Sequence, residues 1–278
     1  MGWRRFPSGC RLNVGKVWFV GAGPGDPDLI TVRGRDLLSR AGAVLYAGSL
    51  VSAVHLQSVP PECECQDSKG MALATITDWL IAKAQQHATV VRLQTGDPSL
   101  YGALVEMVRP LDRAGIEIEV VPGVSSAMAS AAVAVESLTL PEITQTVILT
   151  RVAGRTAMPR GEALEALASH HCTLCLFLSI SLLPKVQSAL LAAGWQPNTP
   201  ILVVHKASWR QDEKLIRGTL ADIRDRCRAQ RLTSQAMIIA SPALGARYWP
   251  TLATSKLYDT TFSHRFRRGG NGSHEVSP

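Results

Sequence analysis

Long apolar runs and aromatic side chains are both scarce in this sequence. Phe, Trp and Tyr make up only 5% of the 278 residues, too few for an obvious surface on which nucleic-acid bases could stack. The uncharged stretch 120–135 contains Pro122 and Gly123 and is shorter than the roughly 20 apolar residues that a membrane-spanning helix needs. We therefore predict no nucleic-acid partner and no insertion into a membrane.

An apolar leader segment is also missing before the first predicted strand, so we expect a cytoplasmic protein. Its six cysteines are then expected to be mostly reduced. Cys172 and Cys175 lie three residues apart along a predicted strand and should point to opposite faces, which favours structural cysteines over a metal or redox motif. Cys63 and Cys65 lie in a predicted polar loop without a second pair at the spacing of a zinc site. We expect no metal.

The net charge of +7 is concentrated at the two ends of the chain. Residues 1–16 hold four basic and no acidic side chains, and residues 256–278 hold four basic and two acidic ones. Removing these contributions of +4 and +2 leaves a net charge of only +1 for residues 17–255. A nearly neutral body argues against a nucleic-acid-binding surface and favours local cationic contacts with a small anionic ligand.

Strands alternate with helices along most of the chain, which predicts an α/β protein with parallel sheet pairing. The strand expected at 214–218 follows the strand at 201–205 after a short loop, so the second sheet should be mixed. The polar segment 136–144 is the expected domain boundary. We predict a disordered basic tail, a largely parallel N-terminal α/β domain, a mixed C-terminal α/β domain and a C-terminal tail at 1–13, 14–138, 139–258 and 259–278.

Three glycine-containing turns follow strands of the first half, at 21–26, 95–102 and 122–126. The first fails as a dinucleotide fingerprint, because Asp26 replaces the third glycine and no helix starts directly behind it. We interpret it as a close backbone approach to a ligand other than a phosphate. Because such turns meet at one sheet edge, together they predict a binding rim. The alternatives are a plain tight loop, a helix start at Asp97 and Pro98, and helix capping by Ser125 and Ser126.

At these turns the sequence resembles the tetrapyrrole (cobalamin-pathway) methyltransferases, which use S-adenosylmethionine. The matching segments are VGAGPGDPDLIT at 20–31, QTGDPSLYG at 94–102 and VPGVSS at 121–126. Further pointers are YAGSLV at 46–51, DS at 67–68, GM at 70–71, TRVAGRTAMP at 150–159, HKASW at 205–209 and YDTTFSHRFR at 258–267. The resemblance covers about residues 16–268, and these pointers imply methylation of carbon 11 of precorrin-4 or of its cobalt form.

The resemblance also implies a fold, a cofactor and a set of contacts. It implies two α/β domains with the active site in the cleft between them, a homodimer, and S-adenosyl-L-methionine that leaves as S-adenosyl-L-homocysteine. The implied cofactor-binding residues are Pro24, Gly96, Asp97, Pro98, Tyr101, Ser125, Ser126, Phe177 and Ala207. Ser49, Arg151, Arg155 and Lys206 are predicted to bind the substrate, the cationic ones because the macrocycle carries many carboxylates, although solvated surface cations remain an alternative.

Methyl transfer from a sulfonium is an in-line displacement with a good leaving group, so the chemistry requires no metal. Any proton removal from the macrocycle needs a general base. Asp97, Tyr46 and His205 are the candidates, and His205 is equally compatible with a core histidine. The alternatives for function are action on another precorrin, on RNA or on diphthamide within the same superfamily, and a noncatalytic module that only binds the cofactor.

Overall fold

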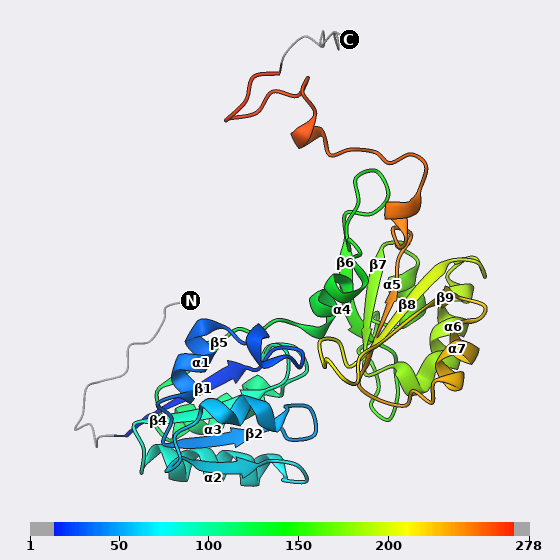
Figure 1. Ribbon diagram of the computed structural model, residues 1–278. Helices are drawn as coiled ribbons and strands as arrows, with labels where there is room; N and C mark the ends of the chain where they lie inside the picture. Colours follow the sequence, from blue (N-terminus) through cyan, green and yellow to red (C-terminus); the bar gives the residue numbers. More distant parts are fainter. Residues whose placement is uncertain (1–13, 270–278) are drawn as a thin grey trace. The chain divides into compact units, whose positions relative to one another are not determined.

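The computed structural model describes residues 14–269 and groups them into two compact units (Figure 1). The first unit runs to Ser130 and also includes Lys206–Lys214, whereas the second comprises Ala131–His205 and the chain from Leu215 onward. The boundary therefore falls between Ser130 and Ala131, whereas the sequence predicted it between residues 138 and 139. The short segment Lys206–Lys214 returns to the first unit from within the second. The predicted disordered tail at 1–13 and the last part of the predicted tail at 259–278 lie outside the described residues.

The first unit contains a five-stranded sheet in the order β3-β2-β4-β1-β5, and all of its pairings are parallel. Its strands are β1 (Lys16–Gly21), β2 (Ala43–Tyr46), β3 (Glu64–Asp67), β4 (Thr89–Gln94) and β5 (Ile118–Val121). The prediction of a largely parallel N-terminal sheet is confirmed. The polar loop predicted around Cys63 and Cys65 is wrong from Glu64 onward, because Cys65 lies in the edge strand β3, whereas Cys63 precedes that strand. Its side chains are mostly exposed, so no apolar alternation marks it in the sequence.

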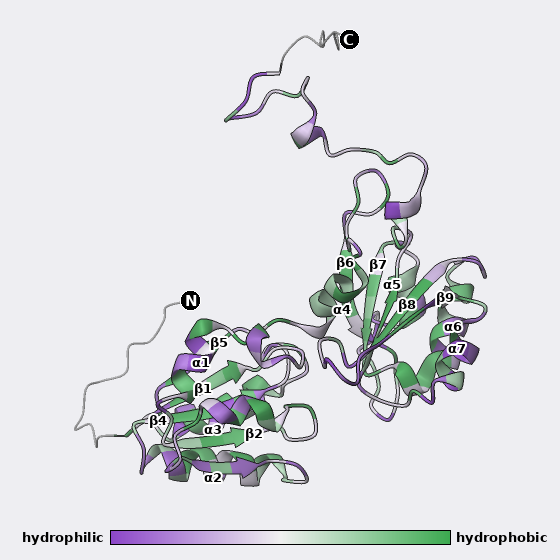
Figure 2. Ribbon diagram, in the orientation of Figure 1, coloured by the Kyte–Doolittle hydropathy of each residue, from purple (hydrophilic) through white to green (hydrophobic). Residues whose placement is uncertain are grey.

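Helices cover both faces of this sheet, as expected when strands are joined by crossover helices. They are α1 (Val32–Leu38), α2 (Leu73–Ala84) and α3 (Leu104–Arg113), with short 3₁₀ helices η1 (Pro27–Leu29) and η2 (Ala53–Ser58). The next helix, α4 (Ser126–Ala134), contains the boundary between the two units. Phe19 and Leu45 pack in one core with α2 and α3, whereas Val20 and Val44 pack in another with α1. Successive strand residues thus bury opposite faces, and Figure 2 accordingly shows most strands in green, the hydrophobic end of its scale.

The second unit contains a mixed sheet in the order β6-β7-β10-β8-β9, which confirms that prediction. Its strands are β6 (Val147–Arg151), β7 (Thr173–Phe177), β8 (Pro200–His205), β9 (Lys214–Thr219) and β10 (Ala236–Ala240). β6 pairs with β7 in parallel, and β10 runs antiparallel to both β7 and β8. The helices are α5 (Leu164–Ala168), α6 (Leu183–Ala192) and α7 (Ile223–Ala229), with 3₁₀ helices η3 (Ile180–Leu182), η4 (Ala246–Tyr248) and η5 (Lys256–Tyr258).

The cysteines of the described residues are all free. Cys172 and Cys175 are both buried, and burial raises the pKa of the Cys175 thiol to about 12, so Cys175 behaves as a small apolar core residue. Within residues 14–269 no group of three or more His, Cys, Asp or Glu side chains is placed to hold a metal ion. No helix of that range has the length and apolar character needed to cross a bilayer.

Candidate active site

The three glycine-containing turns lie against one another at the carboxyl ends of strands β1, β4 and β5 of the parallel sheet. The first and second turns are joined by a pair of backbone hydrogen bonds: the Gly96 N–H donates to the Gly23 carbonyl at 2.8 Å, and the Gly23 N–H donates to the Gly96 carbonyl at 3.3 Å. The third turn is joined to the second, because the Gly123 N–H donates to Oδ2 of Asp97 at 2.9 Å. The predicted meeting of the turns at one sheet edge is therefore present in the structure.

Close packing between the turns explains two of their glycines. A Cβ on Gly21 would lie 2.5 Å from the Gly96 carbonyl oxygen and 2.6 Å from the Cα of Gly123. A Cβ on Gly123 would overlap that same carbonyl oxygen. Gly23 has a φ of +77°, a conformation that glycine adopts without strain. The close backbone approach predicted at the first turn is thus, at Gly21, an approach to the neighbouring turns.

Asp97 connects the second and third turns through its carboxylate. Besides the Gly123 amide, it accepts hydrogen bonds from the backbone N–H of Ser99 at 2.8 Å and from the Ser99 hydroxyl. Burial alone would raise the pKa of Asp97, but the hydrogen bonds from Ser99 and Gly123 outweigh it and hold that pKa below its ordinary value. A carboxylate that is stabilised in its charged form is a weak proton acceptor, which disfavours Asp97 as the general base.

The alternative role of Asp97 and Pro98 as a helix start is wrong. No helix begins there, and α3 starts only at Leu104, after Tyr101 and Ala103 have both taken left-handed backbone conformations with φ of 57° and 50°. Non-glycine residues adopt this conformation rarely, so the surrounding structure must hold it. Tyr101 is half exposed at this strained position. The capping role predicted for Ser125 is confirmed, because its hydroxyl accepts from the Ala127 N–H at 3.3 Å.

Gln94, the last residue of β4, supports the second turn and was not predicted as a site residue. Its amide Nε2 donates to the Gly102 carbonyl at 2.6 Å, whereas its buried Oε1 has no hydrogen-bond partner in the structure. A buried polar side chain at the carboxyl end of a parallel strand is the signal that could have pointed to it.

A second unpredicted residue, Arg92 of β4, lies beneath the segment that carries the predicted residues Tyr46 and Ser49. Its guanidinium donates to the Ser68 hydroxyl at 2.9 Å, and that hydroxyl donates to the Tyr46 carbonyl at 3.0 Å. Burial lowers the pKa of Arg92 to about 10, and the nearby charge of Asp67 opposes this shift. An arginine within the otherwise apolar stretch TVVRLQ is the sequence signal for this buried anchor.

The same segment is fixed a second time by Asp67. Its Oδ1 accepts from the Gly48 N–H at 2.9 Å and from the Lys69 N–H at 2.8 Å. Tyr46 is half-buried at the end of β2, and Ser49 is exposed three residues after it. Two independent anchors therefore hold the backbone that presents these two predicted site residues.

Two predicted site residues, Lys206 and Ala207, lie in the short segment that joins the first unit. Ala207 is buried, and Lys206 donates to Oδ2 of Asp212 at 2.6 Å with its ammonium 5.1 Å from the ring centroid of Trp209. The ion pair already engages the charge that was predicted to bind a substrate carboxylate. The segment contacts the first turn, because the indole N–H of Trp209 donates to the Pro24 carbonyl at 2.9 Å.

The remaining predicted residues belong to the second unit, and their roles stay predictions. Phe177 ends β7 half-buried, and His205 ends β8 half-buried. Arg151, at the end of β6, donates to the carbonyls of Thr156 and Ala157 at 3.1 and 2.9 Å and so braces its own loop. Arg155 is exposed within that braced loop.

Comparison with known proteins places this arrangement in a family. The model of the Tetrapyrrole (Corrin/Porphyrin) Methylases matches residues 16–224. The cobalt-precorrin-4 C(11)-methyltransferase of Priestia megaterium is 47% identical over 254 residues, covering 91% of this chain and 98% of that relative. The precorrin-4 C(11)-methyltransferase of Pseudomonas aeruginosa is 41% identical over 253 residues, covering 91% and 99%.

Solved structures agree with the sequence comparison. The cobalt precorrin-4 methyltransferase CbiF matches with a TM-score of 0.80 and 47% identity over 82% of this chain and 95% of that one. Uroporphyrin-III C-methyltransferase from Thermus thermophilus, complexed with S-adenosyl homocysteine, matches with a TM-score of 0.68 and 29% identity over 84% and 94%. The family and the α/β fold class predicted from the sequence are both confirmed. This chain belongs to the tetrapyrrole (corrin/porphyrin) methylase family.

Proposed function

We propose that this chain transfers the methyl group of S-adenosyl-L-methionine to carbon 11 of precorrin-4, or of cobalt-precorrin-4, and so produces the corresponding precorrin-5. The single observation that carries the proposal is identity of 41–47% over almost the whole length of relatives with this named activity. Both the cobalt form and the metal-free form occur among those names, so the proposal covers both substrates. The chain is then a C-methyltransferase of cobalamin biosynthesis.

The residues of the three joined turns fit the proposed cofactor. None of the turns at 21–26, 95–102 and 122–126 contains Lys or Arg. Asp97 gives the second turn acidic charge, whereas the Asp26 carboxylate of the first turn pairs with Arg210. The charge of Asp97 suits a cationic sulfonium and disfavours a diphosphate. Pro24, Gly96, Tyr101, Ser125 and their neighbours would hold the cofactor, which supplies an electrophilic methyl group when bound.

The chain's own contribution to the reaction is then mainly orientation. Interlocked turns form a rigid support, and holding two reactants in a productive geometry can lower a barrier by roughly 7–11 kcal/mol in favourable cases. The hydrogen bonds that engage Asp97 leave Tyr46 and His205 as the candidates for proton transfer. Arg155 is the cation that we propose for pairing with a carboxylate of the macrocycle, because it is exposed and its loop is braced by Arg151.

The proposal is tested by incubating the protein with methyl-labelled S-adenosylmethionine and either precorrin-4 or cobalt-precorrin-4, followed by NMR of the corrinoid. We expect label on carbon 11 of at least one of the two. Label on another ring carbon would favour action on a different precorrin. Firm cofactor binding with no label in either ring would reject the enzyme and favour a noncatalytic binding module. A homodimer and a cytoplasmic location remain predictions.

A further inference from the structure

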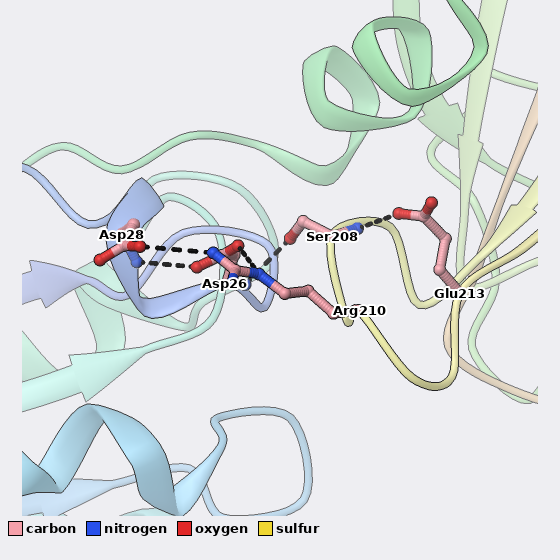
Figure 3. Close-up of polar contacts among 5 residues, drawn as sticks. All are labelled: Asp26, Asp28, Ser208, Arg210 and Glu213. Atoms are coloured by element: carbon pink, nitrogen blue, oxygen red, sulfur yellow. Dashed lines mark hydrogen bonds and ion pairs between the residues drawn. The ribbon is translucent and has the colours of Figure 1, made fainter.

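The segment Lys206–Lys214 holds the first glycine-containing turn from outside the sheet. Trp209 donates its indole N–H to the Pro24 carbonyl at 2.9 Å, and the Asp26 N–H donates to the Ser208 hydroxyl at 3.0 Å. Figure 3 shows Arg210 directed at two carboxylates: its Nε lies 3.0 Å from Oδ2 of Asp26, and its Nη2 lies 3.4 Å from a carboxylate oxygen of Asp28. One carbonyl and one amide of this turn, those of Pro24 and Asp26, are therefore both bound by the same segment.

The indole of Trp209 also explains the glycine at position 25. A Cβ on Gly25 would overlap the Cδ1 and Nε1 atoms of that ring. Gly25 does not have a left-handed backbone conformation, unlike Gly23 two residues earlier. The absence of a side chain at position 25 is therefore explained by the indole alone, and Gly25 and Trp209 form a complementary pair.

The segment is internally braced, so it can impose a shape on the turn. The Ser208 N–H donates to Oε2 of Glu213 at 2.6 Å (Figure 3). The backbone N–H groups of Asp212 and Glu213 donate to the Trp209 carbonyl at 2.8 and 2.9 Å. Lys206 pairs with Asp212 across the same loop. These contacts fix the Trp209 backbone independently of the turn that it holds.

Among the contacts to the turn, the indole contact matters most. The Arg210 side chain is 76% exposed, and exposed ion pairs contribute little because water screens them. Trp209, by contrast, is partly buried, fills the space above Gly25 and satisfies a carbonyl of a buried proline. A buried carbonyl without a hydrogen-bond partner is costly, so loss of this hydrogen bond should destabilise the turn more than loss of the Arg210 ion pairs.

We propose that Trp209 is a positioning residue for the methyl donor. It fixes the backbone around Pro24 and Gly25, the part of the rim against which the cofactor would lie, and so acts through these two residues. This proposal rests on the proposed function, because it requires S-adenosylmethionine at the three turns. It assigns a binding role to a residue outside the glycine-containing turns themselves.

The first experiment measures the Kd of S-adenosyl-L-homocysteine by calorimetry, together with KM and kcat, for Trp209→Phe and Trp209→Ala. The Phe variant retains a ring and loses the N–H donor, and we expect its Kd for the cofactor product to rise about 3- to 10-fold, as the loss of one hydrogen bond produces. The Ala variant should be weaker still, with a larger change in cofactor KM than in kcat. Trp249→Ala is the matched control, because Trp249 lies in the second unit. The Kd of this variant for S-adenosyl-L-homocysteine should equal that of the wild type.

The second experiment tests the complementary pair. Gly25→Ala should weaken binding of S-adenosyl-L-homocysteine, because its methyl group displaces the indole, whereas Gly25→Ala combined with Trp209→Ala should bind as well as Trp209→Ala alone. Multiplicative losses in the double variant, or an unchanged Kd in folded Trp209→Phe, would overturn the positioning role and leave the proposed function intact. A wild-type protein that does not bind S-adenosyl-L-homocysteine would instead reject the proposed function and this inference with it.

Discussion

Asp97 shows how one residue can stabilise a binding rim without taking part in the chemistry. Its carboxylate accepts three hydrogen bonds from two turns, and in the folded protein its pKa is below the ordinary value. Such a group stabilises the fold when it is charged in both states, above its unfolded pKa of about 4. That stabilisation is lost as the pH falls through the lower pKa of the folded state, where the carboxylate becomes protonated.

We therefore expect Asp97→Asn to lower the free energy of unfolding by about 1–3 kcal/mol at pH 7, because hydrogen bonds to a charged acceptor are lost. The difference from wild type should shrink as the pH falls below about 4. Urea unfolding followed by circular dichroism over pH 3–8 measures both effects. Asp112→Asn, on the exposed side of α3, is the matched control. A loss of unfolding free energy that stayed constant across this pH range would contradict stabilisation by the charged Asp97 carboxylate.

At the scale of elements, the sequence was most informative where burial is regular. Most residues of β1, β4 and β8 are buried, and these strands are therefore mostly apolar. A short, mostly apolar run in the sequence predicts such a strand directly. β3 was missed because an exposed edge strand has no apolar face to reveal it. The contacts of Trp209 with Pro24 and Gly25 were also out of reach, because they join residues about 185 positions apart and no local pattern encodes them.

The candidate site likewise has features that the sequence could predict and features that it could not. The three turns were predictable because each follows a strand, and parallel strands end at a common edge. The reason for their glycines was not predictable, since Gly21 and Gly123 are explained by packing against each other and against Gly96. Buried polar supports such as Arg92 and Gln94 were missed because a polar residue inside an apolar stretch shows only that something must pair with it.

The loop after β6 carries the next prediction, because Arg151 braces it while Arg155 stays exposed. If Arg155 pairs with a macrocycle carboxylate, Arg155→Ala should raise the substrate KM about 10-fold or more, the loss expected for a charge-assisted hydrogen bond. The Kd for S-adenosyl-L-homocysteine should not change. Steady-state kinetics and calorimetry give the two values, with Arg228→Ala on the exposed side of α7 as control. An equal increase in the substrate KM and in the Kd for S-adenosyl-L-homocysteine would contradict a specific role of Arg155 in substrate binding.

At the scale of the whole molecule, the distribution of charge separates a tetrapyrrole enzyme from an RNA-modifying relative. Residues 17–255 carry a net charge of only +1, whereas a protein that binds RNA through its backbone must neutralise several phosphates. Such binding also weakens steeply with salt, so its strength at physiological ionic strength is a sensitive measure of how many cations face the nucleic acid.

We expect no binding of fluorescently labelled single-stranded RNA at 150 mM salt, measured by anisotropy up to micromolar protein. Weak binding at low salt should depend on the basic ends of the chain, so a variant without residues 1–13, which removes Arg4, Arg5 and Arg11, should reduce it. Its kcat and KM should equal those of the full chain, because none of these arginines is assigned to the site. Micromolar RNA binding at 150 mM salt that survived this truncation would mean that the nearly neutral body itself contacts nucleic acid. RNA would then be favoured over the carboxylate-rich macrocycle as the substrate.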